Sequence, residues 1–322
     1  MSNSALAPII LFCYNRLEYL TRTVEALRKN TLASESELII YADGIKNPAD
    51  TEKVNSVREY IRNITGFKQI EIHISDENRG LAKSIIRGVT DVLSRYDRVI
   101  VMEDDLVTSP HFLRFMNDAL TVYESVEDVV CVTGYTPVTV KDKDFYFLRG
   151  ADCWGWATWA RGWRYFDSDD RKLFHALKQK KYFRAFDVNG SYPYTEMLIA
   201  QINGKVNSWA IRWRASTFLY DKLTLHSGKN LVEHIGYSGT HVSDRDPDIN
   251  YELSPEQPVV TLISSPCEDS EMVSLISAFY RKTRWSWKSW LKGSIKRLIP
   301  LRILMIYWSR DRLLKSKKEK KK

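Results

Sequence analysis

The chain has 322 residues, with 48 Lys and Arg against 40 Asp and Glu and a formal net charge of +8. Hydrophobic residues make up 44% and charged residues 27%, ordinary values that exclude a disordered, collagen-like or disulfide-scaffold protein. The four cysteines lie far apart, so we expect neither a zinc site nor a disulfide framework, and a reducing cytosol fits. No apolar run reaches about 18 residues, so we expect no membrane-spanning helix, and the polar N-terminus predicts no signal peptide.

Basic residues are concentrated at the C-terminal end. Residues 281–322 hold 16 Lys and Arg against two acids, a net charge of +14, which leaves −6 for residues 1–280. The same segment carries four of the ten tryptophans and an apolar run at 298–308. This combination predicts a segment that lies on an anionic membrane surface, and hence a cytoplasmic protein bound peripherally to the inner face of the cell membrane. The alternatives are a solvated tail whose tryptophans pack on the domain and, less favoured, a nucleic-acid arm; we expect no nucleic-acid partner.

Apolar runs and helical periodicity alternate through the first half of the chain. We expect buried strands at 8–14, 37–42, 69–74, 98–102 and 129–133, and helices at 17–27, 49–64, 80–96 and 110–123. This order predicts an α/β fold with a mostly parallel central sheet and flanking helices. Beyond about residue 144 the sequence is irregular and aromatic, which is typical of a substrate-binding half, and residues 242–280 are uninformative.

Polar side chains follow three of these predicted strands. The carboxyl ends of parallel strands meet at one edge of a sheet, where ligands bind, so these side chains should lie close together. They are Asn15-Arg16, Asp43-Gly44 and Glu103-Asp104-Asp105.

The acidic triplet at 103–105 is the most informative of the three. Adjacent carboxylates repel one another unless a cation compensates, and Mg²⁺ or Mn²⁺ takes carboxylate oxygens while keeping positions open for phosphate. An alternative is an acidic helix N-terminus before the helix at 110–123. However, Ser109 before Pro110 is a better N-cap there, so we favour a site for a metal and a diphosphate.

Together with Asn78-Arg79-Gly80-Leu81-Ala82, these motifs resemble the nucleotide-sugar glycosyltransferases of the GT-A (Rossmann-like) fold. The resemblance covers roughly residues 8–241 and is strongest to the N-acetylglucosaminyltransferase I and II family and its bacterial relatives. It implies a nucleotide-sugar donor, with a UDP-sugar favoured, and a Mn²⁺ or Mg²⁺ ion bound by Asp105 and His241. It also implies that Asp43 contacts the nucleobase. The other residues implied at the donor nucleotide are Asn15, Arg16, Arg79 and Asp104.

Each of these assignments has a simpler alternative. Arg16 can be a surface residue at a helix N-terminus, Arg79 can pair with Glu77, and Asp43-Gly44 can be an ordinary turn. Sugar transfer nevertheless needs these residue types. The nucleoside diphosphate gains negative charge as it leaves the sugar, and a divalent ion and an arginine stabilise that charge.

The second half holds two tryptophan-rich segments. In residues 152–159 we expect Trp154 and Trp159 to be core, whereas Gly155 and Trp156 resemble the family's Gly-Trp loop at the donor sugar and acceptor. Residues 208–213 resemble the segment in which a Trp-Asp pair supplies the catalytic base, but this chain has Ala210 there.

An inverting transfer needs another carboxylate to take the acceptor's proton. The candidates are Glu196 and Glu233, with Glu196 narrowly preferred. The alternative reading of Glu196 is an acid in the first turn of a helix.

The sequence thus predicts a metal-dependent, inverting glycosyltransferase that acts on a lipid-linked or surface-glycan acceptor. Its domain would occupy residues 1–280, with a nucleotide-binding half at about 8–144 and an acceptor half at about 145–241, followed by the basic tail 281–322. Two rivals stay open. A sugar nucleotidyltransferase usually needs a glycine-rich phosphate loop, and residues 12–20 contain no glycine. A non-catalytic glycan-binding or scaffold protein on a decayed transferase fold would explain Ala210.

Overall fold

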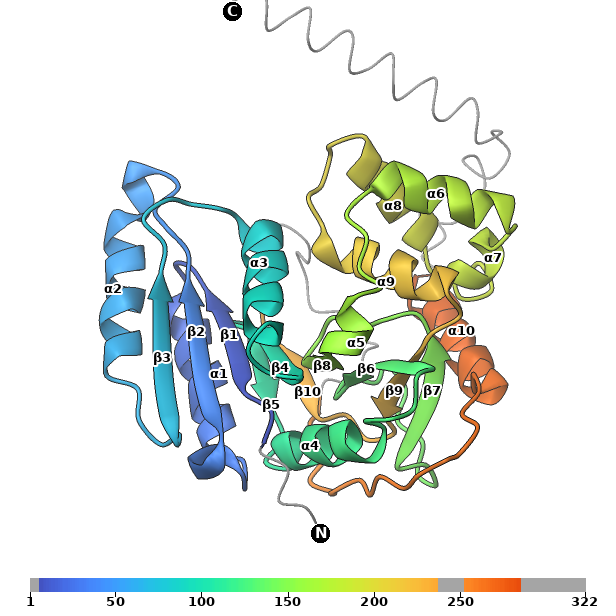
Figure 1. Cartoon of the computed structure of the whole chain (residues 1–322), viewed down its shortest axis with the longest axis horizontal. Helices are drawn as coiled ribbons and strands as arrows, with labels where there is room; N and C mark the ends of the chain where they lie inside the picture. The colour runs from blue at the N-terminus through green and yellow to red at the C-terminus, as the bar shows by residue number, and fades with distance from the viewer. Residues whose placement is uncertain (1–5, 237–251, 285–322) are drawn as a thin grey trace, which may run out of the picture.

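The computed structural model describes residues 6–236 and 252–284. Its centre is an eight-stranded sheet in the order β3-β2-β1-β4-β8-β6-β9-β7 (Figure 1). The strands are β1 (Ile9–Cys13), β2 (Glu37–Ala42), β3 (Gln69–Ile74), β4 (Arg98–Glu103), β6 (Val129–Thr133), β7 (Phe145–Arg149), β8 (Trp156–Trp159) and β9 (Leu223–Ser227). A separate two-stranded ribbon pairs β5 (Leu106–Thr108) with β10 (Val232–His234).

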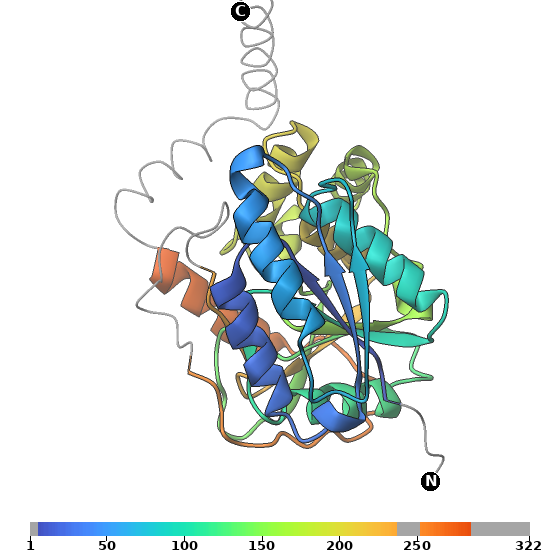
Figure 2. The same cartoon turned by 90° about the vertical axis from the view of Figure 1, so that its left-hand side faces the viewer.

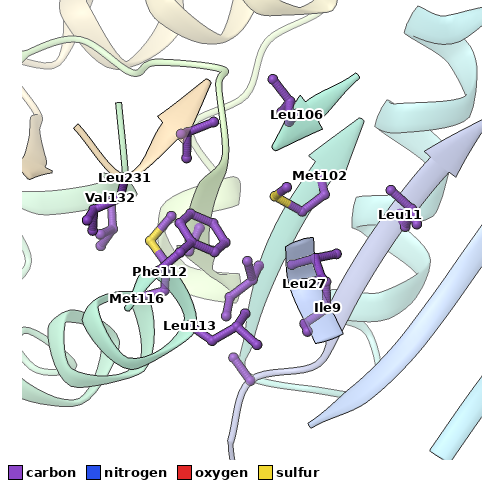
Figure 3. Packing of buried hydrophobic residues seen from close by; sticks show 14 of the residues in the cluster. Ile9, Leu11, Leu27, Met102, Leu106, Phe112, Leu113, Met116, Val132 and Leu231 are labelled. Carbon is purple, nitrogen blue, oxygen red and sulfur yellow. The ribbon is translucent and has the colours of Figure 1, made fainter. Parts of the chain in front are cut away.

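Strands β1 to β4 form the parallel part that the sequence predicted. They pair β3-β2-β1-β4, all parallel. Strand β1 is buried throughout, and its residues alternate between the two faces of the sheet. Ile9 and Leu11 join the core cluster on one face, which Figure 3 shows, and Ile10 joins the cluster on the other. A near-continuous apolar strand is what a parallel sheet covered on both faces requires, and the predicted fold class is confirmed.

Helices cover both faces of this sheet. Residues of α1 (Leu17–Arg28), α2 (Thr51–Arg62) and α4 (Phe112–Val122) pack into the first cluster, and Figure 2 shows α1 and α2 side by side. Residues of α3 (Leu81–Leu93) and α9 (Trp209–Leu219) pack into the second. A third cluster joins α9 to α6 (Asp170–Gln179), α7 (Phe183–Phe186) and α8 (Tyr194–Ile202). The remaining short elements are η1 (Ala33–Glu35), η2 (Pro48–Asp50) and α5 (Ala160–Trp163).

Three details differ from the sequence prediction. Helix α4 begins at Phe112 rather than at residue 110, and its N-cap is His111 rather than Ser109. The Ser109 hydroxyl donates to the Ser254 carbonyl and accepts the backbone N–H of His111 at 3.4 Å. Strands β5 and β10 were not predicted; three-residue strands carry almost no periodic signal. Helix α10 (Ser270–Arg284) falls largely in the uninformative segment and continues through residue 280, where we drew the end of the domain.

Within residues 6–236 and 252–284, none of the helices has the length and apolar character needed to cross a bilayer. The basic tail proposed for the membrane surface lies outside the described residues, apart from the end of α10.

Candidate active site

The ends of β1, β2 and β4 meet at one edge of the sheet. Cys13 pairs with Ala42, and Phe12 pairs with Glu103, so the residues that follow these strands are neighbours. This is the arrangement predicted from parallel topology. It places the start of α1, the Asp43 turn and the acidic triplet around one site.

Arg16, at the end of β1, pairs with two acids of the triplet at the end of β4. Its Nη2 donates to Oδ1 of Asp104, and its Nη1 lies 2.9 Å from Oδ2 of Asp105. The Arg16 side chain is 30% exposed, whereas both aspartates are buried. The simpler reading of Arg16 as a surface helix residue therefore does not fit: its guanidinium is the counter-ion of the triplet.

One arginine does not compensate all three acids. Burial raises the pKa of Glu103 to about 8, and the charges of Asp105 and Asp104 add to the effect. Burial also raises the pKa of Asp104 to about 6, although Arg16 opposes the shift. The pKa of Asp105 is lowered, because the hydrogen bond from His234 and the charge of Arg16 outweigh its burial. The edge thus has a surplus of negative charge and one firmly ionised carboxylate.

The ribbon of β5 and β10 brings His234 next to Asp105. His234 pairs with Leu106, and its Nε2 lies 3.3 Å from Oδ2 of Asp105. Its ring stacks on Trp154, with the ring centroids 4.9 Å apart. A side chain on Gly236 would overlap the Asp105 carboxylate, so the chain passes very close to it. Only the long-range pairing of β10 with β5 reveals this contact.

The metal prediction concerns Asp105 and His241. His241 lies outside the described residues, and within the described ranges no three His, Cys, Asp or Glu side chains are arranged to hold a metal ion. The edge still fits a divalent cation, because oxygen donors with an uncompensated negative charge are what Mg²⁺ and Mn²⁺ prefer. The assignment of a metal ion to Asp105 and His241 stays a prediction.

Asp43 holds the neighbouring loop in place. Its carboxylate accepts hydrogen bonds from the backbone N–H groups of Gly44, Arg79 and Gly80, each at 2.9 Å, and from Nδ2 of Asn78 at 3.1 Å. The side chain is 9% exposed. Asp43-Gly44 is therefore not an ordinary turn. Any contact of Asp43 with a nucleobase would be made by a carboxylate that already has four donors.

Gly44→Ala should lower the free energy of unfolding by about 3 kcal/mol, since the new Cβ would overlap the backbone of Glu77 and the loop would have to move. Urea unfolding measures this. Gly204→Ala is the matched control, because Gly204 has open space but a φ of +65° and should cost only about 1 kcal/mol. Equal losses at both positions would show that space around Gly44 is not limiting.

The other predicted nucleotide contacts lie on the rim. Nδ2 of Asn15 donates to Asp50 at 3.1 Å, and Nε of Arg79 donates to Oγ of Ser75 at 3.0 Å. Arg79 thus pairs with Ser75 rather than with Glu77. Both residues lie beside the loops that follow β1 and β3, so their assignment to the nucleotide stays a prediction.

Trp156 lies in the core. It is 1% exposed and packs against Trp163, Trp209 and Trp213, with ring centroids 5.2 to 6.0 Å apart. Its ring has no free face for a sugar, so the structure favours the packing role for Trp156. Trp154, which we expected to be core, is partly buried against the core cluster and also stacks on His234 beside Asp105.

The two predicted bases lie on α8 and β10. Glu196 is exposed in the first turn of α8, while Thr195, Leu198 and Ile199 form the buried face of that helix. Glu233 follows the strand alternation of β10, so its side chain is on the opposite face from His234. The catalytic role of either residue stays a prediction.

Asp152 is a carboxylate that the sequence reasoning missed. Its Oδ1 accepts the backbone N–H of Cys153 at 2.6 Å and that of Trp154 at 3.4 Å. Burial raises the pKa of Cys153, and the charges of Asp152 and then Glu103 add to this, so both carboxylates are near enough to act on the same thiol. The signal available in the sequence was its place directly before the tryptophan-rich loop.

The burial of His226 should make the stability of the protein depend on pH. His226 is 3% exposed and stacks on Tyr146, and burial lowers its pKa from 6.5 to about 4. As the pH falls below 6.5, His226 becomes protonated in the unfolded chain but stays neutral in the folded protein. The free energy of unfolding should therefore drop by roughly 3 kcal/mol toward pH 4. Urea unfolding at pH 7 and pH 4.5 measures the loss, and His226→Gln should remove this part of it. An equal loss in the variant would assign the pH dependence to other groups.

Comparison with known proteins gives the family. No curated protein matches the chain. Among solved structures, S. aureus TarS is 18% identical, with a TM-score of 0.30 over 42% of this chain and 22% of that chain. TarS 1–349 in complex with UDP is 18% identical, with a TM-score of 0.30 over 43% and 37% of the two chains. The mannosyltransferase PcManGT from Pyrobaculum calidifontis, in complex with GDP-Man and Mn²⁺, is 13% identical, with a TM-score of 0.29 over 42% and 35%.

In each of these matches the chain spans less than two thirds of the known protein. The model of glycosyl transferase family 2 matches residues 9–174, more than half of the chain. That stretch contains Arg16, the Asp43 loop, the acidic triplet and Asp152. With this sheet edge and this match, the chain belongs to glycosyl transferase family 2.

Proposed function

We propose that the protein transfers a sugar, with inversion and with the help of a divalent metal, from a UDP-sugar to a hydroxyl of a lipid-linked or surface-glycan acceptor. The observation that carries this proposal is the pairing of Arg16 with Asp104 and Asp105 at the shared end of β1 and β4. It puts a cation and an ionised carboxylate where an α/β sheet binds its ligand.

The chemistry of the donor explains why both charges are present. Breaking the bond between the sugar C1 and the diphosphate leaves negative charge on the leaving group. Arg16 is partly exposed and can donate to a phosphate oxygen while keeping one aspartate. Asp105 and His241 are the residues proposed to hold Mn²⁺ or Mg²⁺, which when bound neutralises the charge of the diphosphate.

The proton of the acceptor hydroxyl needs a separate acceptor, because Ala210 stands where the related family has an Asp. Among the three candidates, Asp152 is supported best. One carboxylate oxygen of Asp152 is held by two backbone N–H groups, which fixes its orientation and leaves Oδ2 for a hydroxyl. Glu196 and Glu233 remain the alternatives.

Binding of nucleoside diphosphates tests the proposal. We expect UDP to bind more tightly in the presence of Mn²⁺ in isothermal titration, with GDP and CDP as comparisons, and a UDP-sugar to be turned over. Metal-dependent binding without turnover of any donor would favour the non-catalytic scaffold. Release of pyrophosphate from a nucleoside triphosphate and a sugar 1-phosphate would favour the nucleotidyltransferase.

Peripheral membrane binding is a second part of the proposal, supported by the composition of residues 285–322. These residues hold 13 Lys and Arg and four tryptophans. A chain ending at Arg284 should no longer sediment with anionic vesicles, and binding by the full chain should weaken with salt, because the Debye length falls to about 3 Å at 1 M. Equal sedimentation of the two chains would remove the membrane role.

A further inference from the structure

Arg214 is a half-buried cation whose side chain forms no ion pair with a described acid. The acid on which its charge acts is Asp187: burial raises the pKa of Asp187 to about 6, and the charge of Arg214 opposes this shift. Arg214 lies on α9, and its side chain makes no hydrogen bond or ion pair with any residue that the structure describes; its Nε is buried and unsatisfied. The nearest other arginine on the same helix, Arg212, donates to the Ser208 carbonyl and to Oδ1 of Asn207. A buried charge without a partner costs stability, so it is retained where a ligand supplies the missing charge.

Two aromatic rings lie beside the Arg214 guanidinium, that of Tyr194 and that of Phe186, whose centroid is 5.8 Å from Cζ. Cζ of Arg214 lies 4.1 Å from the ring centroid of Tyr194. Tyr192 contacts both Tyr194 and Tyr280, with ring centroids 4.4 and 4.6 Å apart. The hydroxyls of Tyr194 and Tyr280 make no hydrogen bond within the described ranges. Exposed aromatic faces stack on sugar rings, and such hydroxyls can donate to sugar or phosphate oxygens.

This cluster joins three helices that are far apart in the sequence. Tyr194 begins α8, Arg214 lies in the middle of α9, and Tyr280 belongs to α10; Figure 1 shows the three helices on the same side of the molecule. Arg214 also borders the loop before Asp152, since a Cβ on Gly150 would lie 3.4 Å from Cγ of Arg214. No ion pair between Asp152 and Arg214 occurs in the described structure, although the charges of both act on Tyr194 and His226. The two groups therefore border one region from different elements.

We propose that Arg214, with the rings of Tyr194, Tyr192 and Tyr280, forms an acceptor subsite that binds an anionic group of the acceptor, a phosphate or a carboxylate. The assignment to the acceptor rests on the proposed function. The donor diphosphate belongs to the edge at Arg16, on β1 and β4, whereas Arg214 lies across the Asp152 loop from that edge. A saccharide phosphate or an acidic sugar has the required chemistry: an anion for the guanidinium and ring faces for the tyrosines.

Anion binding by the full chain tests the subsite. The donor site is first saturated with UDP and Mn²⁺, and glycerol 3-phosphate or glucuronate is then titrated while the melting temperature is followed. The wild type should be stabilised by at least one of the two anions, and Arg214→Met should bind that anion roughly ten- to hundredfold more weakly. Arg214→Lys, which keeps the charge, should retain part of the binding. Arg212→Met is the matched control and should respond like the wild type.

Four results would overturn the subsite. The first is a wild type whose melting temperature neither anion raises, and the second is an Arg214→Met variant that is stabilised as much as the wild type. The third is an Arg212→Met variant that loses the stabilisation equally. The fourth is an Arg214→Met variant that loses affinity for UDP, which would assign the arginine to the donor. Without any ligand, Arg214→Met should melt at the same temperature as the wild type or higher; a lower value would indicate that the cation serves packing. If UDP fails to bind the wild type while the anion response still depends on Arg214, the proposed function fails and the anion site stands.

Discussion

Asp105→Asn is expected to abolish the effect of Mn²⁺ on UDP binding and to reduce sugar transfer by at least about a hundredfold. Asn keeps the size and hydrogen-bonding shape of the side chain but removes the charge. Asp105 is the one acid of the triplet whose pKa is lowered, so its negative charge is what the folded protein stabilises. Isothermal titration of UDP with and without Mn²⁺ measures the loss.

The control for Asp105→Asn is the same chemical change at a surface acid. Asp118 lies on α4 with a half-exposed side chain, 4.0 Å from Arg114, and Asp118→Asn should leave UDP binding unchanged. The melting temperature of both variants shows whether the fold survives; Arg16 can keep Asp104 as its partner in the Asp105 variant. If Mn²⁺ still tightens UDP binding by Asp105→Asn, the metal is held elsewhere.

The sheet edge could be predicted because the signals for its strands lie in short, continuous stretches of sequence. A buried apolar run predicts a parallel strand, the end of that strand is visible in the sequence, and parallel topology then places all such ends together. This is why Arg16 and the triplet were named before any contact was known. Their ion pairs are consistent with that prediction, although the pattern does not distinguish a free Arg16 from one paired with the acids.

Contacts that depend on long-range pairing could not be predicted. His234 reaches Asp105 because β10 pairs with β5, and neither three-residue strand is visible as a periodic pattern. Asp43 was assigned to the nucleobase from a motif, yet the loop at 78–80 satisfies its carboxylate. Trp156 is buried although its motif predicts a contact with the sugar, because a run of tryptophans does not show which ring faces the core.

Asp152→Asn is the second large effect that we expect, with turnover falling by about 10²- to 10⁴-fold while UDP binding changes little. Asn can accept the same two backbone hydrogen bonds through its Oδ1, so the loop before Trp154 should keep its conformation. What Asn lacks is the basicity needed to take the proton of the acceptor hydroxyl. Steady-state turnover of a UDP-sugar, measured beside UDP affinity, separates loss of a base from loss of the donor.

Glu196→Gln and Glu233→Gln decide between the three carboxylates. Each is the same isosteric change as Asp152→Asn, but the side chains project from the exposed turn of α8 and from the face of β10 opposite His234. Both variants should therefore keep near-normal turnover. An inactive Glu196 or Glu233 variant beside an active Asp152→Asn variant would assign the role of catalytic base to that glutamate. Helix α8 or the ribbon of β5 and β10 would then have to turn toward the triplet when the acceptor binds. If all three variants stay active, none of these carboxylates takes the proton, and Ala210 then marks a real loss of the family's base rather than its replacement.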